Sequence, residues 1–296
     1  MKKRHHHHAE NTYRQKEQRG LLISIVINTV TMFLEIGGGI YSGSLALLSD
    51  AGHMFSHIFA LGVSYFAIRI AIRPANTKNT FGFYRAEILA ALLNAVTIFV
   101  VAYFILAEAY HRLQDPENIA SGPMFVIALI GLSVNALTAY ILHDVSKEDM
   151  NVRGAFLHML GDLFSSVGVV IAAIIVKYTG WVYADPIASA LIALVISYWA
   201  YGLLRDAVHI LLQATPKELS VDEIKTSLLQ LADIKGVHDV HLWELTKGMY
   251  MMTAHIEVED QPISQVDNIR KQAQHILSER FNINHADLQV QCATKP

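Results

Sequence analysis

The chain has a single cysteine and few charged residues for its length. Cys292 has no second cysteine to pair with, so no intramolecular disulfide can stabilise the fold. Only 17% of the 296 residues are charged and 53% are apolar, which is unusual for a soluble domain of this length. The formal net charge of -3 shows no excess of basic residues, and this argues against a nucleic-acid partner.

Long apolar segments account for this composition. A helix needs about twenty apolar residues to cross roughly 30 Å of hydrocarbon, and several segments approach or exceed that length. The predicted membrane spans are residues 20–41, 45–72, 86–110, 122–143, 155–178 and 184–204. Because the first of these is too long for a signal peptide and lacks a cleavage pattern, we expect it to remain in the protein.

Positive charges lie mainly on one side of these spans. Lys and Arg are concentrated before the first span and in the loops after the second and fourth, whereas the opposite side has Arg112 and Lys177. Short cytoplasmic loops retain positive charge, so we expect a multi-pass integral membrane protein with both termini in the cytoplasm. The short loops and small soluble domain are typical of a bacterial inner (plasma) membrane protein.

The sequence pattern changes after about residue 210. Two stretches have apolar residues at helical spacing and three have strand-like patterns. The helical stretches are residues 221–232 and 263–281, and the strand-like ones are 238–245, 250–257 and 286–291. The order αββαβ predicts a small α+β domain with two helices on one face of a sheet.

Three parts of the chain follow from these patterns. We predict a His-containing cytoplasmic tail at 1–19, an all-α six-helix transmembrane domain at 20–210 and a cytoplasmic αββαβ domain at 211–296. The run His5 to His8 in the tail is compatible with a native metal-collecting segment or an engineered tag.

Ionisable residues inside two of the spans predict a metal site. Such residues are costly in a membrane unless they face a polar interior, so each suggests a function. Asp50, His53 and His57 share one face of the second span, and His158 and Asp162 share one face of the fifth. Two such helices can supply a tetrahedral shell of imidazole nitrogens and a carboxylate oxygen, which suits zinc and tolerates cobalt or cadmium. We therefore predict His53, His57, His158 and Asp162 as metal ligands.

Other polar residues in the spans have simpler interpretations. Asp50 follows the Gly43-Ser44 turn, and we interpret it as the N-terminal cap of its helix. Interhelical hydrogen bonding or a hydrated pathway explains the remaining residues equally well. These are Asn28, Glu35, Asn94, Glu108 and Asn135.

Three stretches resemble the cation diffusion facilitator family, and in particular its bacterial zinc exporter branch. They are residues 42–53, 80–87 and 158–162, and the resemblance extends over nearly the whole chain. It implies a six-span domain, a ferredoxin-like cytoplasmic domain that pairs in a homodimer, and export of zinc by alternating access driven by inward proton flow.

One position departs from the family pattern. Zinc-transporting members usually have His-x-x-x-Asp in the second span, whereas this chain has His53 and His57. With neutral imidazoles, the net charge of a shell holding a divalent ion rises from zero to +1. Imidazole also binds nickel, cobalt and copper, so cobalt, nickel, cadmium or iron remain alternatives to zinc as the main cargo.

Histidines in the cytoplasmic domain are candidates for a regulatory zinc site. His238 and His255 match positions where some family members bind zinc, and His285 is a third candidate. The loop at 73–85 contains no histidine, so we expect the additional loop site of some relatives to be absent.

Two other classes of protein share features with this sequence. His53-x-x-x-His57 resembles a histidine box of membrane desaturases, but those enzymes need many more histidines, and we predict neither an enzyme nor an organic cofactor. A membrane metal sensor that binds zinc without transporting it remains open. The partners predicted for a transporter are divalent metal ions, protons, the lipid bilayer and a second copy of the chain.

Overall fold

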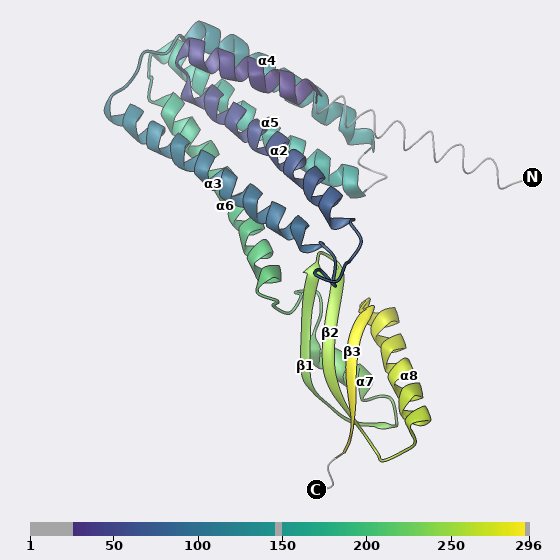
Figure 1. The fold of residues 1–296 in the computed structure, drawn as a ribbon. Helices are drawn as coiled ribbons and strands as arrows, with labels where there is room; N and C mark the ends of the chain where they lie inside the picture. The colour runs from purple at the N-terminus through teal and green to yellow at the C-terminus, as the bar shows by residue number, and fades with distance from the viewer. Residues whose placement is uncertain (1–25, 146–149, 294–296) are drawn as a thin grey trace, which may run out of the picture. The chain divides into compact units, whose positions relative to one another are not determined.

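The computed structural model describes residues 26–145 and 150–293, with side chains described outside 141–160 (Figure 1). The chain forms two compact units. One contains the described residues up to Val63 together with Asn94–Gly202, and the other contains Ser64–Leu93 and the described residues from Leu203 on.

Long apolar helices make up most of the first unit. In the described part of the chain, five helices are long and apolar enough to cross a membrane. They are α2 (Leu45–Ala71), α3 (Arg85–Gln114), α4 (Ser121–Val145), α5 (Met150–Thr179) and α6 (Ala184–Leu211). Residues 26–42 form a further helix, which corresponds to the first predicted span. The predicted six-helix arrangement is therefore confirmed.

The turn between helix 26–42 and α2 is made by Gly43 and Ser44. Gly43 has a φ of 71°, a left-handed conformation that glycine adopts without steric cost. The Ser44 hydroxyl then accepts a hydrogen bond from the Leu47 amide at 3.2 Å, as an N-terminal cap does. The prediction that Asp50 caps this helix is thus wrong, because the helix already begins at Leu45.

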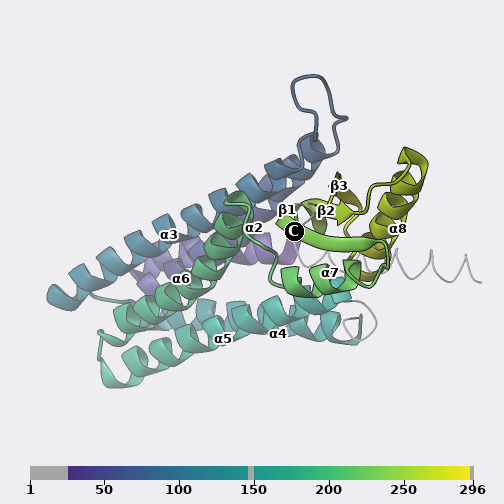
Figure 2. The same cartoon turned by 90° about the horizontal axis from the view of Figure 1, so that it is seen from below.

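Small residues bring the helices of this unit close together. Buried alanines occupy the contacts between helices, including Ala46 of α2, Ala128 of α4, and Ala172 and Ala173 of α5. Helices α4 and α5 lie side by side in both views (Figure 2). Many large apolar side chains are exposed on the outside, as expected for a surface that faces lipid.

The second unit contains the αββαβ domain that the sequence predicts. Its elements are α7 (Val221–Leu228), β1 (Ile234–Thr246), β2 (Met249–Val258), α8 (Ile263–Phe281) and β3 (His285–Cys292). In the sheet order β1-β2-β3, β2 pairs antiparallel with β1 and parallel with β3. Helix α7 is shorter than predicted because the Leu231 amide turns back to the Leu228 carbonyl and leads the chain into β1.

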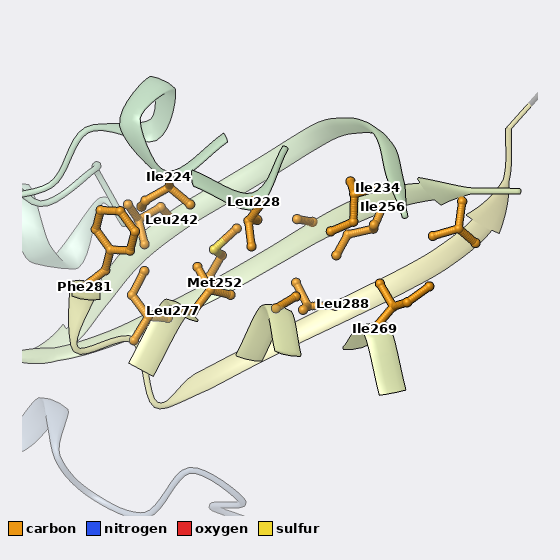
Figure 3. Close-up of a cluster of buried hydrophobic side chains, with 14 residues drawn as sticks. Ile224, Leu228, Ile234, Leu242, Met252, Ile256, Ile269, Leu277, Phe281 and Leu288 are labelled. Atoms are coloured by element: carbon orange, nitrogen blue, oxygen red, sulfur yellow. The ribbon is translucent and has the colours of Figure 1, made fainter. Parts of the chain in front are cut away.

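One face of this sheet carries the core. Alternate residues of β2, such as Met252 and Ile256, point toward α7 and α8, where Ile224, Leu228 and Leu277 complete the cluster (Figure 3). The period of two in the strand matches burial on one face. Both helices therefore cover the same face of the sheet, as predicted.

Candidate metal site

Helices α2 and α5 bring three of the four predicted ligands together. The Asp162 carboxylate oxygen Oδ1 lies 3.1 Å from His53 Nε2 and 3.8 Å from His57 Nε2. The two imidazole Nε2 atoms are 3.2 Å apart, and their rings meet edge to face. One ligand atom from each residue falls within 4.8 Å of the others. These atoms are close enough to bind one metal ion after small adjustments of the rings.

The three side chains differ in their access to the outside of the protein. His53 and Asp162 are each 3% exposed, whereas the His57 side chain is 28% exposed. His57 is therefore the most accessible of the three candidate ligands.

His158, the fourth predicted ligand, belongs to α5 one helical turn before Asp162. Its side chain is outside the described residues, so its part in the site stays a prediction. The same holds for the tail residues His5 to His8.

Asp50 has a different role from the cap that the sequence suggested. Its side chain is buried and accepts hydrogen bonds from the hydroxyls of Ser165 and Ser166 on α5, the second at 2.9 Å. Asn135 of α4 in turn donates to the Ser166 hydroxyl at 2.8 Å. A polar chain thus links α2, α4 and α5 beside the candidate metal ligands, and the sequence pattern did not reveal this link.

The formal charges of the site are mostly negative. With neutral imidazoles, a divalent ion held by His53, His57 and Asp162 would have one positive charge in excess. Asp50 lies three residues before His53 on the same helix face, and its carboxylate can supply the balancing negative charge. Charge balance matters here because interactions between charges are stronger inside a protein than in water.

Gly161 makes room for an aromatic side chain next to the cluster. A Cβ atom at this position would lie 2.6 Å from Cη2 of Trp199 on α6. The Trp199 ring centroid is 6.4 Å from that of His53. The indole therefore forms part of the wall of the site, and only glycine allows it to approach α5 so closely.

Asp185 holds the start of the helix that carries both histidines, a role the sequence pattern did not reveal. It is fully buried at the beginning of α6 and accepts hydrogen bonds from the Ser44 hydroxyl, the Leu45 amide and the Ala46 amide, at 2.5, 2.7 and 3.1 Å. A carboxylate at a helix N-terminus also interacts favourably with the helix dipole. Asp185 thereby fixes the position of α2.

The cytoplasmic histidines separate into a pair and a single residue. His238 and His255 are partners across β1 and β2, with ring centroids 5.4 Å apart. His238 Nδ1 lies 3.7 Å from Glu257 Oε1, and His255 Nε2 lies 3.7 Å from an oxygen of Asp239. Both histidines lie on the face of the sheet opposite α7 and α8, where the His238 side chain is 45% exposed and the His255 side chain 32%.

His285 is not brought next to this pair. It lies opposite Met251, whereas His255 lies opposite Gln289, so four residues of strand, about 13 Å, separate them along the sheet. The His285 ring instead contacts Phe81, with centroids 5.7 Å apart.

Comparisons with known proteins agree over almost the whole chain. Residues 21–212 match the family model of the cation efflux transmembrane domain, and residues 216–292 match that of the cation efflux protein cytoplasmic domain. The cadmium, cobalt and zinc/H(+)-K(+) antiporter of Bacillus subtilis (strain 168) is 37% identical over 289 residues, covering 97% of this chain and 91% of the relative.

Two further relatives show the same extent of similarity. The zinc transporter ZitB of Escherichia coli (strain K12) is 38% identical over 289 residues, 97% of this chain and 91% of the relative. The metal cation efflux system protein CzcD of Cupriavidus metallidurans is 38% identical over 276 residues, 93% of this chain and 87% of the relative.

Proposed function

Because the chain belongs to the cation efflux family, whose members are membrane transporters and not enzymes, we propose that it exports divalent transition-metal ions in exchange for protons. The main cargo is zinc. The observation that carries this proposal is the cluster of His53, His57 and Asp162, which joins two membrane-spanning helices through atoms within 4.8 Å of one another.

In the proposed cycle, the metal ion enters from the cytoplasm and binds between α2 and α5. His53, His57 and Asp162 are ligands, and His158 is the fourth. Imidazole binds a metal only when its nitrogen is free of a proton, so binding of metal and binding of protons compete. The helices then rearrange to open the site to the other side, where protons displace the ion.

Zinc is favoured as cargo by the ligand types and by the relatives. Imidazole nitrogens and one carboxylate are typical ligands of zinc, and the relatives include zinc transporters and an antiporter named for cadmium, cobalt and zinc. Cobalt, nickel, cadmium and iron are the alternatives, because His57 in place of a carboxylate changes the charge of the shell.

Two accessory features complete the proposal. The cytoplasmic domain joins two copies of the chain in a homodimer, which the match to the family's cytoplasmic-domain model supports; light scattering of the detergent-purified protein would give its mass. His238 and His255, with Glu257, form a regulatory zinc site on this domain, and the 5.4 Å between the two rings supports it. His285 would join only after a rearrangement.

Uptake of zinc into liposomes tests the main proposal. Reconstituted protein should carry zinc into the liposomes, where a zinc-sensitive dye reports it. Uptake should be faster when the liposome interior is more acidic than the outside, because protons then flow outward. Asp162→Asn should reduce this flux by about tenfold or more, because the only carboxylate ligand is lost. Asp115→Asn, which removes an exposed carboxylate outside the cluster, should leave it unchanged.

Two results would contradict the proposal. Equal flux in Asp162→Asn and in the original protein would show that the cluster is not the transport site. Zinc binding without any flux in the original protein would instead favour a metal sensor.

A further inference from the structure

A second buried carboxylate, Glu35, lies in the transmembrane unit apart from the metal ligands. Glu35 belongs to helix 26–42 and is 1% exposed. Its carboxylate oxygen Oε2 is buried, and no hydrogen-bond donor in the described part of the chain reaches it. An ionised carboxylate is costly inside a membrane protein unless a cation or hydrogen-bond donors compensate it. The described residues supply neither a cation nor a donor to Glu35 Oε2, so this carboxylate is suited to bind a proton or another cation.

Space for this carboxylate is built into the neighbouring helix. A Cβ atom at Gly131 of α4 would overlap Glu35 Oε1, so glycine at this position admits the carboxylate between the two helices. One turn further along α4, Asn135 has a second buried acceptor, Oδ1, that no donor in the described residues reaches. Two acceptors without donors thus lie on this part of the bundle interior, as expected where a proton is bound and released.

The charged groups that act on Glu35 are also negative. They are Asp50 from α2 and Asp162 from α5, while α4 contributes the uncharged Gly131 and Asn135. Among the buried polar residues that the structure describes, none is a lysine or arginine. Negative neighbours favour uptake of a cation by Glu35, and a divalent ion bound at Asp162 would oppose it.

We propose that Glu35 binds one of the counter-transported protons, at a position physically separate from the metal ligands. This inference rests on the proposed exchange of metal for protons. When a divalent ion arrives at His53 and Asp162, its charge favours dissociation of the Glu35 carboxylic O–H bond, and the proton leaves to the cytoplasm. After the ion is released outside, a proton from that side joins the carboxylate. The proton on Glu35 and the metal ion thus exclude each other through charge without sharing ligands, in addition to the competition at the imidazoles.

The test counts protons released when zinc binds to the full chain in weakly buffered detergent solution, and measures zinc uptake into liposomes. Glu35→Gln should bind zinc but release about one proton fewer per ion. It should also lose the acceleration of zinc uptake by a pH gradient, while exchange of zinc for zinc without a gradient continues. Glu35→Asp should restore the released proton. Thr31→Val, which alters a buried residue one turn earlier on the same helix, should behave like the original protein.

Wild-type proton release and full pH-gradient stimulation in Glu35→Gln would overturn the inference. If Glu35→Gln does not bind zinc, the variant Gly131→Ala provides the test. Its added methyl group displaces the Glu35 carboxylate, so it should shift the pH at which zinc binding releases the proton. No shift there would overturn the inference as well. Failure of the proposed function is different, since the original protein would then show no zinc flux or no effect of the pH gradient.

Discussion

The replacement His57→Asp should make zinc bind more tightly and with a stronger dependence on pH. The change lowers the formal charge of a zinc-loaded shell from +1 to zero. His57 Nε2 lies 3.8 Å from Asp162 Oδ1, and two unit charges about 4 Å apart interact by about 4 kcal/mol at an effective dielectric constant of about 20. In the metal-free site a repulsion of this size between two carboxylates favours binding of a proton, and a bound divalent ion outweighs the repulsion by attracting both.

The gain in affinity is smaller than this full interaction. The residue 57 side chain is 28% exposed, so water screens part of the charge, and the shorter aspartate reaches less far than imidazole. We therefore expect a gain of about 1–3 kcal/mol, or roughly 5- to 150-fold in the dissociation constant for zinc. Because one of the two carboxylates is protonated in the empty site, zinc binding should also release more protons than in the original protein.

Isothermal titration calorimetry of the purified full chain in several buffers measures both quantities. The buffers differ in ionisation enthalpy, so the heats give the number of protons released with each zinc ion. His111→Asp is the matched control, because it adds a carboxylate at an exposed position of α3 outside the cluster, and it should leave zinc affinity unchanged. Unchanged or weaker zinc binding by His57→Asp would refute the assignment of residue 57 as a ligand and the charge argument built on it.

Three further predictions concern other parts of the molecule. Asp185→Asn keeps one acceptor oxygen but loses another at the start of α2, so we expect a loss of about 1.5–3 kcal/mol in stability, seen as a lower unfolding temperature in detergent. Ile256→Ala removes a fully buried side chain from the cytoplasmic core and should cost about 2–5 kcal/mol, measured by denaturant unfolding followed through tryptophan fluorescence. The pKa of Asp267 is lowered by hydrogen bonds from Lys271 and then Arg270. Its contribution to stability should be present above pH 4 and disappear as the pH falls through the lowered pKa, and Asp267→Asn should remove this dependence.

Local patterns in the sequence predicted the helices correctly and singled out three candidate ligands that the fold brings together. The spacing of His53 and His57 puts both on one face of a helix whatever lies opposite, and the apolar runs have few alternative structures in a membrane. The strand and helix patterns after residue 210 likewise repeat at periods of two and 3.6 residues, which determine the buried face of each element.

Such patterns do not predict contacts between helices that are distant in the sequence. Asp50 appeared to be a cap because a turn precedes it, but its partners Ser165 and Ser166 lie more than 110 residues away. The role of Asp185 depends on the place where α6 begins relative to α2. The space for Glu35 depends on a glycine of α4. Each of these requires knowledge of which helices are neighbours, and periodicity within one helix does not contain that information.

The alanines between the transmembrane helices bear on how the protein moves. Branched side chains that interlock resist sliding, because each step forces them over one another. Ala46, Ala128, Ala172 and Ala173 reduce such interlocking at their own positions, and small shear movements between packed helices are one way in which proteins change conformation. In the proposed transport cycle, larger residues at these positions should therefore slow the change between inward-open and outward-open states without touching a candidate ligand.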